Sequence, residues 1–335
     1  MAEIKVALLG VGNVGRSFAD YIGRRAGESS IRIQALADSS GGLILHDSAR
    51  MNRLLAHKVA GGHVRGFAPG EATKNAEDFI ASLPAAGIHV LVESLPTAIR
   101  DGQPALGLLL SALERRINVV TVDKGPLVHG FEALREAGRA TGAGIAFTGT
   151  TGVSVPEWLD GERVVEIRGV LNGTTNHILT EMEEQGKTFQ QALADARAEG
   201  IAEPDPRLDV EGWDTACKIM ILAKRLMKAG GTLNDVSRIG IGPETESLIA
   251  TGRETGRIVR LVGRARIYQG RVRLSVTPKL LNPESPFYAV RGTSKAATFR
   301  TASGGEAISH GLSGRDAIAE VILGDILRLG EQKAV

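Results

Sequence analysis

The densest group of potentially reactive side chains lies between Glu203 and Lys218, where the sequence reads EPDPRLDVEGWDTACK. Carboxylates can bind an ammonium group or orient a proton transfer, and a lysine beside them can move that proton. Asp214 and Lys218 are four residues apart and would share one face of a helix. Spacing alone favours an ordinary ion pair between helical neighbours over a catalytic pair.

A glycine-rich segment near the N-terminus predicts a dinucleotide site. It follows an apolar run and precedes a predicted helix, and it reads Gly10-Val-Gly12-Asn13-Val14-Gly15. Gly10 would allow the tight turn, Gly12 the approach of a diphosphate, and Gly15 the packing of helix on sheet. The first N–H groups of the helix, around Asn13 and Val14, would face the diphosphate. The alternative is a turn with a structural role only.

Asp38 ends the next predicted strand and would accept hydrogen bonds from the adenosine ribose hydroxyls. This favours NAD over NADP, because the 2′-phosphate of NADP is anionic and neither Ser39 nor Ser40 offers a positive charge. Lys58 or Arg53 could fold back to Asp38, so NADP use stays open. The alternative for Asp38 is a simple turn residue.

Two further loops follow predicted strands and would lie at the same edge of the sheet. One runs from Glu93 through Ser94 to Thr97, and the other contains Asp123 and Lys124. A charged residue at the carboxyl end of a strand is well placed to meet a ligand. We therefore expect Lys124 to be functional, with a surface lysine before a Gly-Pro turn as the alternative.

The segment Asn172-Gly173-Thr174-Thr175-Asn176-His177 follows a short strand and precedes a helix. Thr175 or Asn176 could cap that helix, or its N–H groups could hold a substrate carboxylate. His177 has no second histidine at metal-binding spacing, which favours a structural role.

The elements that must position these residues alternate between strand and helix through the first 150 residues. The predicted strands are 4–9, 31–37, 90–93, 119–122 and 144–147, and the predicted helices are 16–25, 104–116 and 131–141. This order is typical of a Rossmann-type, doubly wound parallel sheet with its ligand crevice at the carboxyl ends of the strands.

The second half of the chain predicts an α+β domain. Helices are expected at 176–185 and 210–227, and apolar residues alternate with arginines over 257–276, around a turn at Gln269-Gly270. That pattern indicates an antiparallel hairpin with a solvated or interface face rather than a nucleic-acid surface. A last helix at 316–329 would close the chain.

Composition sets the outer limits. The 335 residues suggest roughly two domains, and a net charge of +2 argues against a general nucleic-acid binder. The chain has 42 glycines without a collagen period, and its single cysteine excludes an intrachain disulfide and a cysteine-based zinc site. No secretory leader or membrane-length apolar run is evident, so we expect a cytoplasmic protein.

Taken together, the motifs resemble homoserine dehydrogenase over nearly the whole chain. GVGNVG, DKGPL, TGTTGVSVP, GVLNGTTNHIL and GIAEPDPRLDVEGWDTACKIMILA occur in the family's order, and the last is the most specific. The resemblance implies the NAD- or NADP-dependent interconversion of L-homoserine and L-aspartate 4-semialdehyde, in threonine and methionine biosynthesis.

The resemblance also implies roles for individual residues. Lys218 and Lys124 would lie at the reacting carbon, with Lys218 moving the hydroxyl proton and Asp214 orienting it. Glu203 and Asp209 would bind the substrate ammonium group, and the turn Gly173-Thr174-Thr175 would border the substrate. On this ground the catalytic role for Lys218 replaces the ordinary ion pair.

Two further sets of contacts, and one departure from the family's pattern, follow from the resemblance. The cofactor would meet Gly10, Gly12, Asn13, Val14, Gly15, Asp38, Ser39, Ser94 and Lys124, and also the turn from Gly311 to Arg315. A sodium or potassium ion would bind main-chain carbonyls of Thr148, Thr151, Val153 and Val155. The family's usual asparagine turn is replaced by Thr293-Ser294-Lys295.

The expected organisation has three parts. Residues 1–148 would bind the dinucleotide, 149–309 would form a catalytic and dimerisation domain, and 310–335 would return as a helix to the first domain. A homodimer is expected, without membrane or nucleic-acid partners, and a C-terminal amino-acid-sensing domain is not expected. The rival functions are another dehydrogenase for amino acids or semialdehydes, and an NAD-binding sensor without turnover.

Overall fold

The computed structural model describes residues 3–25, 30–311 and 315–331. The chain divides into two compact units, residues 1–150 with 314–335 and residues 151–313. No helix of the described residues is long and apolar enough to cross a membrane.

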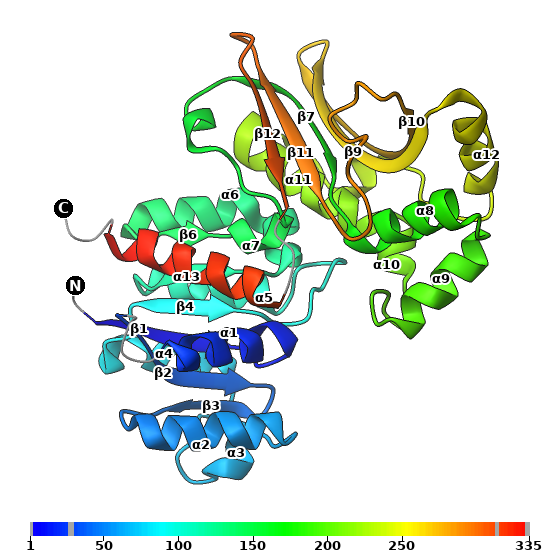
Figure 1. Ribbon diagram of the computed structural model, residues 1–335. Helices are drawn as coiled ribbons and strands as arrows, with labels where there is room; N and C mark the ends of the chain where they lie inside the picture. Colours follow the sequence, from blue (N-terminus) through cyan, green and yellow to red (C-terminus); the bar gives the residue numbers. More distant parts are fainter. Residues whose placement is uncertain (1–2, 26–29, 312–314, 332–335) are drawn as a thin grey trace. The chain divides into compact units, whose positions relative to one another are not determined.

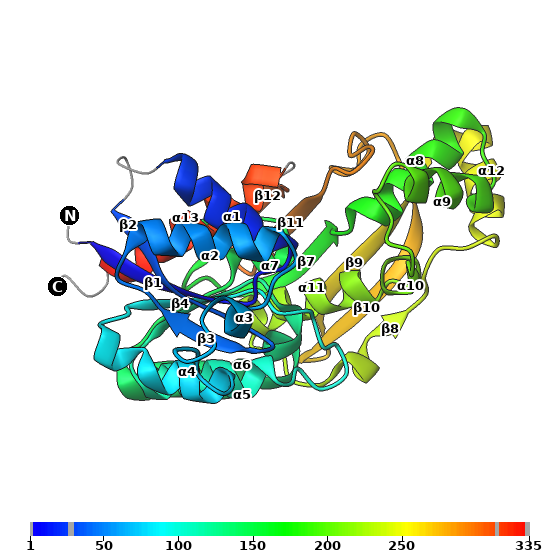
Figure 2. The same cartoon turned by 90° about the horizontal axis from the view of Figure 1, so that it is seen from below.

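The first unit is built around a six-stranded sheet with the order β3-β2-β1-β4-β5-β6. Helices lie on both faces of this sheet, with α1 and α13 on one face and α4, α5 and α6 on the other (Figures 1 and 2). The strands are β1 (Ile4–Leu9), β2 (Ile31–Asp38), β3 (Gly41–Ile44), β4 (Val90–Glu93), β5 (Asn118–Thr121) and β6 (Ile145–Ala146). The helices are α1 (Asn13–Arg24), α2 (Ser48–Val59), α3 (Val64–Phe67), α4 (Ala76–Ser82), α5 (Ala105–Glu114), α6 (Lys124–Thr141) and α13 (Arg315–Glu331), and a short α7 (Thr148–Thr151) spans the unit boundary.

One strand departs from the predicted parallel sheet. β3 pairs antiparallel with β2, whereas the other strand pairs of this sheet are parallel. The chain reverses over Ser39 and Ser40 because the Asp38 carboxylate accepts hydrogen bonds from the Ser40 N–H (2.8 Å) and hydroxyl (2.6 Å). A two-residue turn of this kind joins antiparallel strands. The predicted strands of this sheet pair in parallel as expected, and β3 is an additional edge strand that the sequence did not predict.

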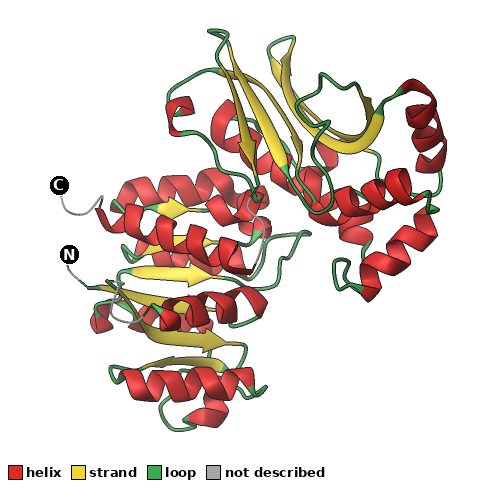
Figure 3. Ribbon diagram, viewed as in Figure 1, coloured by secondary structure: helices red, strands yellow, loops and turns green. Residues whose placement is uncertain are grey.

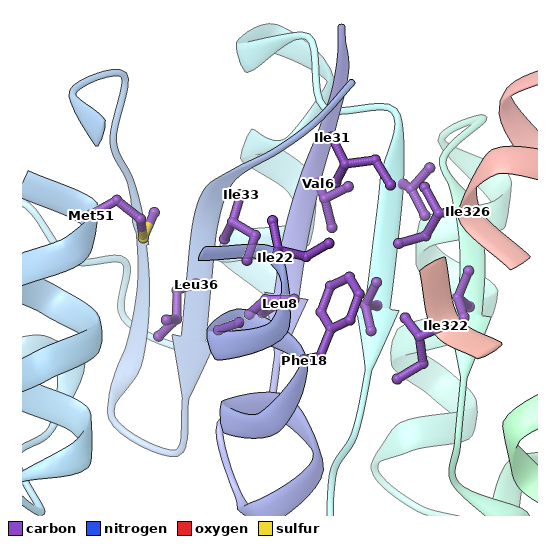
Figure 4. Close-up of a cluster of buried hydrophobic side chains, with 14 of the residues drawn as sticks. Val6, Leu8, Phe18, Ile22, Ile31, Ile33, Leu36, Met51, Ile322 and Ile326 are labelled. Carbon is purple, nitrogen blue, oxygen red and sulfur yellow. The ribbon is translucent and has the colours of Figure 1, made fainter. Parts of the chain in front are cut away.

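A cluster of buried apolar side chains joins α1 and α13 to the sheet (Figure 4). Phe18 of α1 and Ile322 and Ile326 of α13 are fully buried against Val6 and Leu8 of β1. Burying a side chain of this size contributes about 1.5–3 kcal/mol. The predicted return of the C-terminal helix to the first domain is therefore confirmed, and it completes that domain's core.

The second unit contains a six-stranded, mainly antiparallel sheet with the order β12-β11-β7-β9-β10-β8. Figure 3 draws its strands in yellow and its helices in red. Its strands are β7 (Val164–Val170), β8 (Ser237–Arg238), β9 (Ile258–Tyr268), β10 (Arg271–Leu281), β11 (Ala296–Thr301) and β12 (Glu306–His310). Its helices are α8 (Gly173–Gln185), α9 (Phe189–Ala198), α10 (Arg207–Val210), α11 (Trp213–Met227) and α12 (Thr245–Thr255).

Helix α11 packs on one face of this sheet, where Gly263 of β9 leaves room for it: a Cβ there would lie 3.0 Å from Thr215 Cγ2. The predicted hairpin is confirmed, since β9 and β10 pair antiparallel around Gln269 and Gly270, both with positive φ. The single helix predicted over 210–227 is instead α10 followed by α11. The break falls at Gly212, whose φ of 81° is left-handed.

Candidate active site

Two candidate sites are present, one in each unit. The glycine-turn site comprises Gly10–Gly15 and the loops that follow β2, β4 and β5. The lysine–carboxylate network comprises Asn172, Asp209, Asp214 and Lys218 of the second unit.

The glycine turn connects β1 to α1 at the point where the strand order of the sheet reverses. Gly10 has φ 90°, and a Cβ there would lie 2.8 Å from the Ser94 carbonyl oxygen. A Cβ on Gly15 would lie 2.4 Å from the Gly10 carbonyl oxygen, whereas one on Gly12 would meet no atom within 4 Å. Gly10 and Gly15 are therefore required by the fold, and Gly12 leaves open space beside the turn.

The N-terminus of α1 can receive an anion. Its N-cap is Gly12, and no side chain caps its first N–H groups. The Ser94 hydroxyl donates instead to the Gly10 carbonyl oxygen at 2.9 Å, so it holds the turn in place. An open cradle beside an uncapped helix terminus suits a dinucleotide diphosphate.

Asp38 is surrounded by hydrogen-bond donors. It accepts from Lys58 Nζ and, at 3.0 Å, from the Val64 N–H, in addition to both Ser40 donors. Burial alone would raise the pKa of Asp38, but these hydrogen bonds outweigh it and lower that pKa to about 2. Of the two cations considered from the sequence, Lys58 reaches Asp38, whereas Arg53 is exposed.

A second carboxyl group lies buried at the end of β4. Glu93 is fully buried and accepts hydrogen bonds from the Thr121 hydroxyl (2.5 Å) and the Leu95 N–H (2.6 Å). Burial and then the neighbouring charge of Asp123 raise the pKa of Glu93 to about 8. Glu93 therefore carries a proton at neutral pH.

The loop after β5 presents Lys124 at the first position of α6. Asp123 caps this helix by accepting from the Gly125 N–H at 2.9 Å, and its own N–H donates to Thr121 Oγ1 at 3.0 Å. Burial raises the pKa of Asp123, and the hydrogen bond from Gly125 offsets part of that rise. The helix begins at Lys124, seven residues before the predicted 131, because the Asp123 side chain caps it there.

In the second unit, Lys218 Nζ donates to Asp214 Oδ2 at 2.6 Å and to the Leu171 carbonyl oxygen at 2.8 Å. Asn172 Nδ2 links the two carboxylates, at 2.6 Å from Asp209 Oδ1 and 2.9 Å from Asp214 Oδ2. Burial and then the Asp214 charge raise the pKa of Asp209, while Asn172 and Thr174 lower it. Lys218 hydrogen-bonds to Asp214, whereas Asp209 accepts from the uncharged Asn172 side chain, so a ligand cation would be attracted to Asp209.

Asn172 is the residue of this network that sequence reasoning missed. Its side chain caps α8 by accepting from the Thr175 N–H at 2.8 Å, so Thr175 and Asn176 are not the cap. The helix begins at Gly173 because Asn172 keeps an extended backbone. The signal was available, since asparagine is among the best N-cap residues.

The remaining predicted substrate residues lie at different distances from the network. Gly173 and Thr174 open α8, and the Thr174 hydroxyl donates to the Ile201 carbonyl oxygen at 3.2 Å. Glu203 is exposed on the loop before α10 and takes no part in the hydrogen bonds that define the network. Cys217 is fully buried in α11, which leaves it unsuited to attack a substrate.

The residues predicted to hold a cation fall on both sides of the unit boundary, with Thr148 in the first unit and Thr151, Val153 and Val155 in the second. The Val153 carbonyl oxygen accepts from the Thr151 hydroxyl at 2.9 Å. Among the described residues there is no cluster of histidine, cysteine and acidic side chains that could hold a metal ion. Gly311 forms an isolated antiparallel β-bridge with Val153. Residues 312–314 of the predicted cofactor turn lie outside the described residues.

A doubly wound sheet with this glycine turn, joined to a unit that carries a lysine–carboxylate network, defines an oxidoreductase that uses a nicotinamide dinucleotide. Residues 154–327 match the family model for homoserine dehydrogenase, and residues 10–148 match the model for its NAD-binding domain. The chain belongs to the homoserine dehydrogenase family.

Individual relatives agree with this assignment. The chain is 32% identical to the homoserine dehydrogenase of Methanocaldococcus jannaschii, over 97% of this chain and 98% of the relative. It is also 32% identical to the NAD(+)-dependent homoserine dehydrogenase of Pseudomonas canavaninivorans, over 98% and 97% of the two chains. Among solved structures, the putative homoserine dehydrogenase from Archaeoglobus fulgidus matches with a TM-score of 0.82 and 28% identity, covering 97% of this chain and 99% of that one.

The predicted family, fold class and enzyme class are therefore confirmed. The chain is an NAD(P)-dependent oxidoreductase that acts on the CH–OH group of homoserine. The rival functions, a different amino-acid or semialdehyde dehydrogenase and an NAD-binding sensor, receive no support from these matches.

Proposed function

We propose that Lys218 moves the proton in the interconversion of L-homoserine and L-aspartate 4-semialdehyde. The observation that carries this role is the hydrogen bonding of Lys218 Nζ, which uses two of its three donor positions on Asp214 and Leu171. The third is left for the substrate oxygen. In the reducing direction Lys218 would donate a proton to that oxygen as it becomes a hydroxyl, and in the oxidising direction it would take the proton back.

When bound, the nicotinamide ring supplies or accepts the hydride at the substrate's C4 carbon. Asp214 would hold the Lys218 ammonium in position, and Lys124 would lie at the reacting carbon as the second lysine. Asp209 would bind the substrate ammonium group, because the hydrogen bond of Lys218 goes to Asp214 and Asp209 is held by the uncharged Asn172 side chain. Glu203 and the Gly173–Thr175 turn would complete the substrate contacts.

The proposed cofactor is NAD. The low pKa of Asp38 keeps this residue ionised at neutral pH, which disfavours the 2′-phosphate of NADP, although Lys58 reduces the repulsion. The NAD(+)-dependent relative from Pseudomonas canavaninivorans supports this choice. The cofactor would contact Gly10, Gly12, Asn13, Val14, Gly15, Ser39, Ser94, Lys124 and Gly311.

Several properties of the whole enzyme are proposed with it. The enzyme would be a cytoplasmic homodimer in threonine and methionine biosynthesis, joined through the sheet of the second unit. Backbone oxygens are hard ligands suited to a sodium or potassium ion, and those of Thr148, Thr151, Val153 and Val155 would provide them. Light scattering would test the dimer, and replacing sodium and potassium by choline would test the cation.

The direct test is an assay of the purified protein with L-homoserine and NAD, followed by nicotinamide absorbance. We expect NADH to form from NAD and L-homoserine, and NADPH to form more slowly when NADP replaces NAD. Absence of turnover with either cofactor would overturn the function, and a preference for NADP would overturn the role given to Asp38.

A further inference from the structure

Lys295 is a lysine of the second unit to which nothing above assigns a role. It precedes β11, which pairs antiparallel with β7 so that Ala296 lies opposite Val170 (Figure 1). That register brings Lys295 beside Leu171, whose carbonyl oxygen binds Lys218. The topology of the sheet therefore places a second lysine next to the lysine–carboxylate network.

Two glycines make room for the Lys295 side chain. A Cβ on Gly152 would lie 3.5 Å from Lys295 Nζ, and a Cβ on Gly311 would lie 2.6 Å from Lys295 Cβ and 3.2 Å from its Cε. The Gly311 N–H also donates to the Lys295 carbonyl oxygen at 2.7 Å. The backbone at Gly152 and Gly311 thus packs against the Lys295 side chain. Because both residues are glycines, neither places a side chain over the ammonium group.

The described residues give the charge of Lys295 no direct partner. Among the described residues its half-buried ammonium group makes no ion pair and no hydrogen bond. Burial lowers the pKa of Lys295, the charge of Lys218 lowers it further, and Asp214 raises it. Asp214 already accepts hydrogen bonds from Lys218 and Asn172, so an anionic group of a ligand would give Lys295 a direct partner.

The amino-acid substrate of the proposed function offers such an anion. It carries an ammonium group, which the Asp209–Asp214 pair would attract, a reacting oxygen, which faces Lys218, and an α-carboxylate, which so far has no cation. We propose that Lys295 binds the α-carboxylate of the substrate and thereby selects an amino acid over an amino alcohol. This inference rests on the proposed function of the lysine–carboxylate network.

The first test compares steady-state kinetics of the full chain with those of Lys295→Ala and Lys295→Arg. Loss of a charge-assisted hydrogen bond should raise KM for L-homoserine about 10- to 100-fold in Lys295→Ala. We expect kcat to change less and KM for NAD to stay the same, and Lys295→Arg to restore most of the affinity. Lys279→Ala, an exposed lysine of the same unit, is the matched control and should match the unaltered chain.

The second test uses 3-aminopropan-1-ol, which is homoserine without its carboxylate, as an inhibitor against L-homoserine. Its inhibition constant should be the same for the unaltered chain and for Lys295→Ala, because the interaction that is lost involves the missing group. An inhibition constant that rises in Lys295→Ala as much as KM does would overturn the proposal and indicate a general disturbance of the site.

Two other outcomes would also overturn it. One is a raised dissociation constant for NADH with an unchanged KM for L-homoserine, which would assign Lys295 to the cofactor diphosphate. The other is a Lys295→Ala enzyme with unaltered kinetics. Circular dichroism and thermal unfolding would show that the variants fold. Failure of the proposed function would appear differently, as an unaltered chain that does not oxidise L-homoserine.

Discussion

The glycine-turn site and the lysine–carboxylate network are constructed in different ways. The first depends on backbone approach: Gly10 and Gly15 lie where a Cβ would collide with a main-chain oxygen, and the following loops hold the turn. The second depends on charged side chains from separate elements, with Asn172 before α8 as the link between Asp209 and Asp214. We expect added methyl groups to damage the first site and removed charges to damage the second.

The buried carboxyl groups of the glycine-turn site show a related contrast. Asp38 has donors on both oxygens and an adjacent lysine, and its pKa falls to about 2. Glu93 accepts two hydrogen bonds, faces another acid rather than a lysine, and has a pKa of about 8. The carboxyl groups at the ends of β2 and β4, the strands on either side of β1, thus differ in pKa because of the donors around them as well as because of burial.

The largest effect is expected from Lys218→Ala. Removing the proton-transfer group should lower kcat by on the order of a hundredfold or more, with folding and NAD binding retained. Rapid-mixing or steady-state absorbance assays would measure this. Lys224→Ala, six residues further on in the same helix, should keep normal turnover. Near-normal turnover of Lys218→Ala would remove Lys218 from the mechanism.

Gly12→Ala should separate cofactor binding from stability. The added methyl group meets no protein atom within 4 Å, so the melting temperature should not fall. The methyl group would occupy space that a diphosphate needs. A steric cost of about 1–3 kcal/mol in binding free energy would raise the dissociation constant for NADH by roughly 10- to 100-fold. Fluorescence titration would measure it, with Gly23→Ala, also in open space, as the control. Unchanged affinity in Gly12→Ala would place the diphosphate elsewhere.

Gly15→Ala should produce the opposite result within the same turn. A Cβ at 2.4 Å from the Gly10 carbonyl oxygen forces the backbone to shift, which costs about 1–3 kcal/mol of unfolding free energy. Chemical denaturation would detect this. A Gly15→Ala protein as stable as Gly12→Ala would show that the turn adjusts freely and that the contrast between the two glycines is wrong.

The smallest effect concerns Glu93 and pH. The folded-state pKa of about 8 lies above the ordinary value of 4.5, so the native state holds a proton that the unfolded chain releases. The contribution of Glu93 to the free energy of unfolding is fully present below the ordinary pKa of 4.5 and is lost as the pH rises through about 8. Glu93→Gln, which keeps the shape without titrating, should be more stable than the unaltered chain at high pH by on the order of 1 kcal/mol.

The difference in stability between Glu93→Gln and the unaltered chain should shrink as the pH falls towards 4.5. Asp38→Asn serves as the control with the opposite sign: a lowered pKa means that ionised Asp38 stabilises the fold near neutral pH, so this variant should be less stable there. Parallel pH dependence of the two variants would contradict the contrast between these carboxyl groups.

Much of the first unit could be predicted because its signals are local. The apolar run at Ile4–Leu9, the glycine turn and the acid at Asp38 follow one another at short spacing. The direction of β3 could not be predicted, because it depends on hydrogen bonds from Ser40 to Asp38 that compete with the usual parallel crossover. Lys58 was one of two open candidates, and only the folded chain distinguishes it from Arg53.

The second site was less accessible from the sequence. Asp214 and Lys218 could be paired by helical spacing, but Asn172 precedes Asp209 by 37 residues, and only tertiary structure joins them. Lys295 was noticed solely as a departure from the family's turn. The register of β11 on β7 places Lys295 beside Leu171 and the lysine–carboxylate network, and no local sequence pattern encodes that register.

The return of α13 to the first unit has a consequence for how the protein is made. Residues 1–150 leave the ribosome before the second unit, whereas Ile322 and Ile326, which fill the core beside Phe18, leave it after that unit. Until α13 is made, the apolar face that it covers on the dinucleotide unit stays exposed. The first unit can therefore complete its core only after the second unit has been synthesised, and an apolar face exposed in this way favours aggregation.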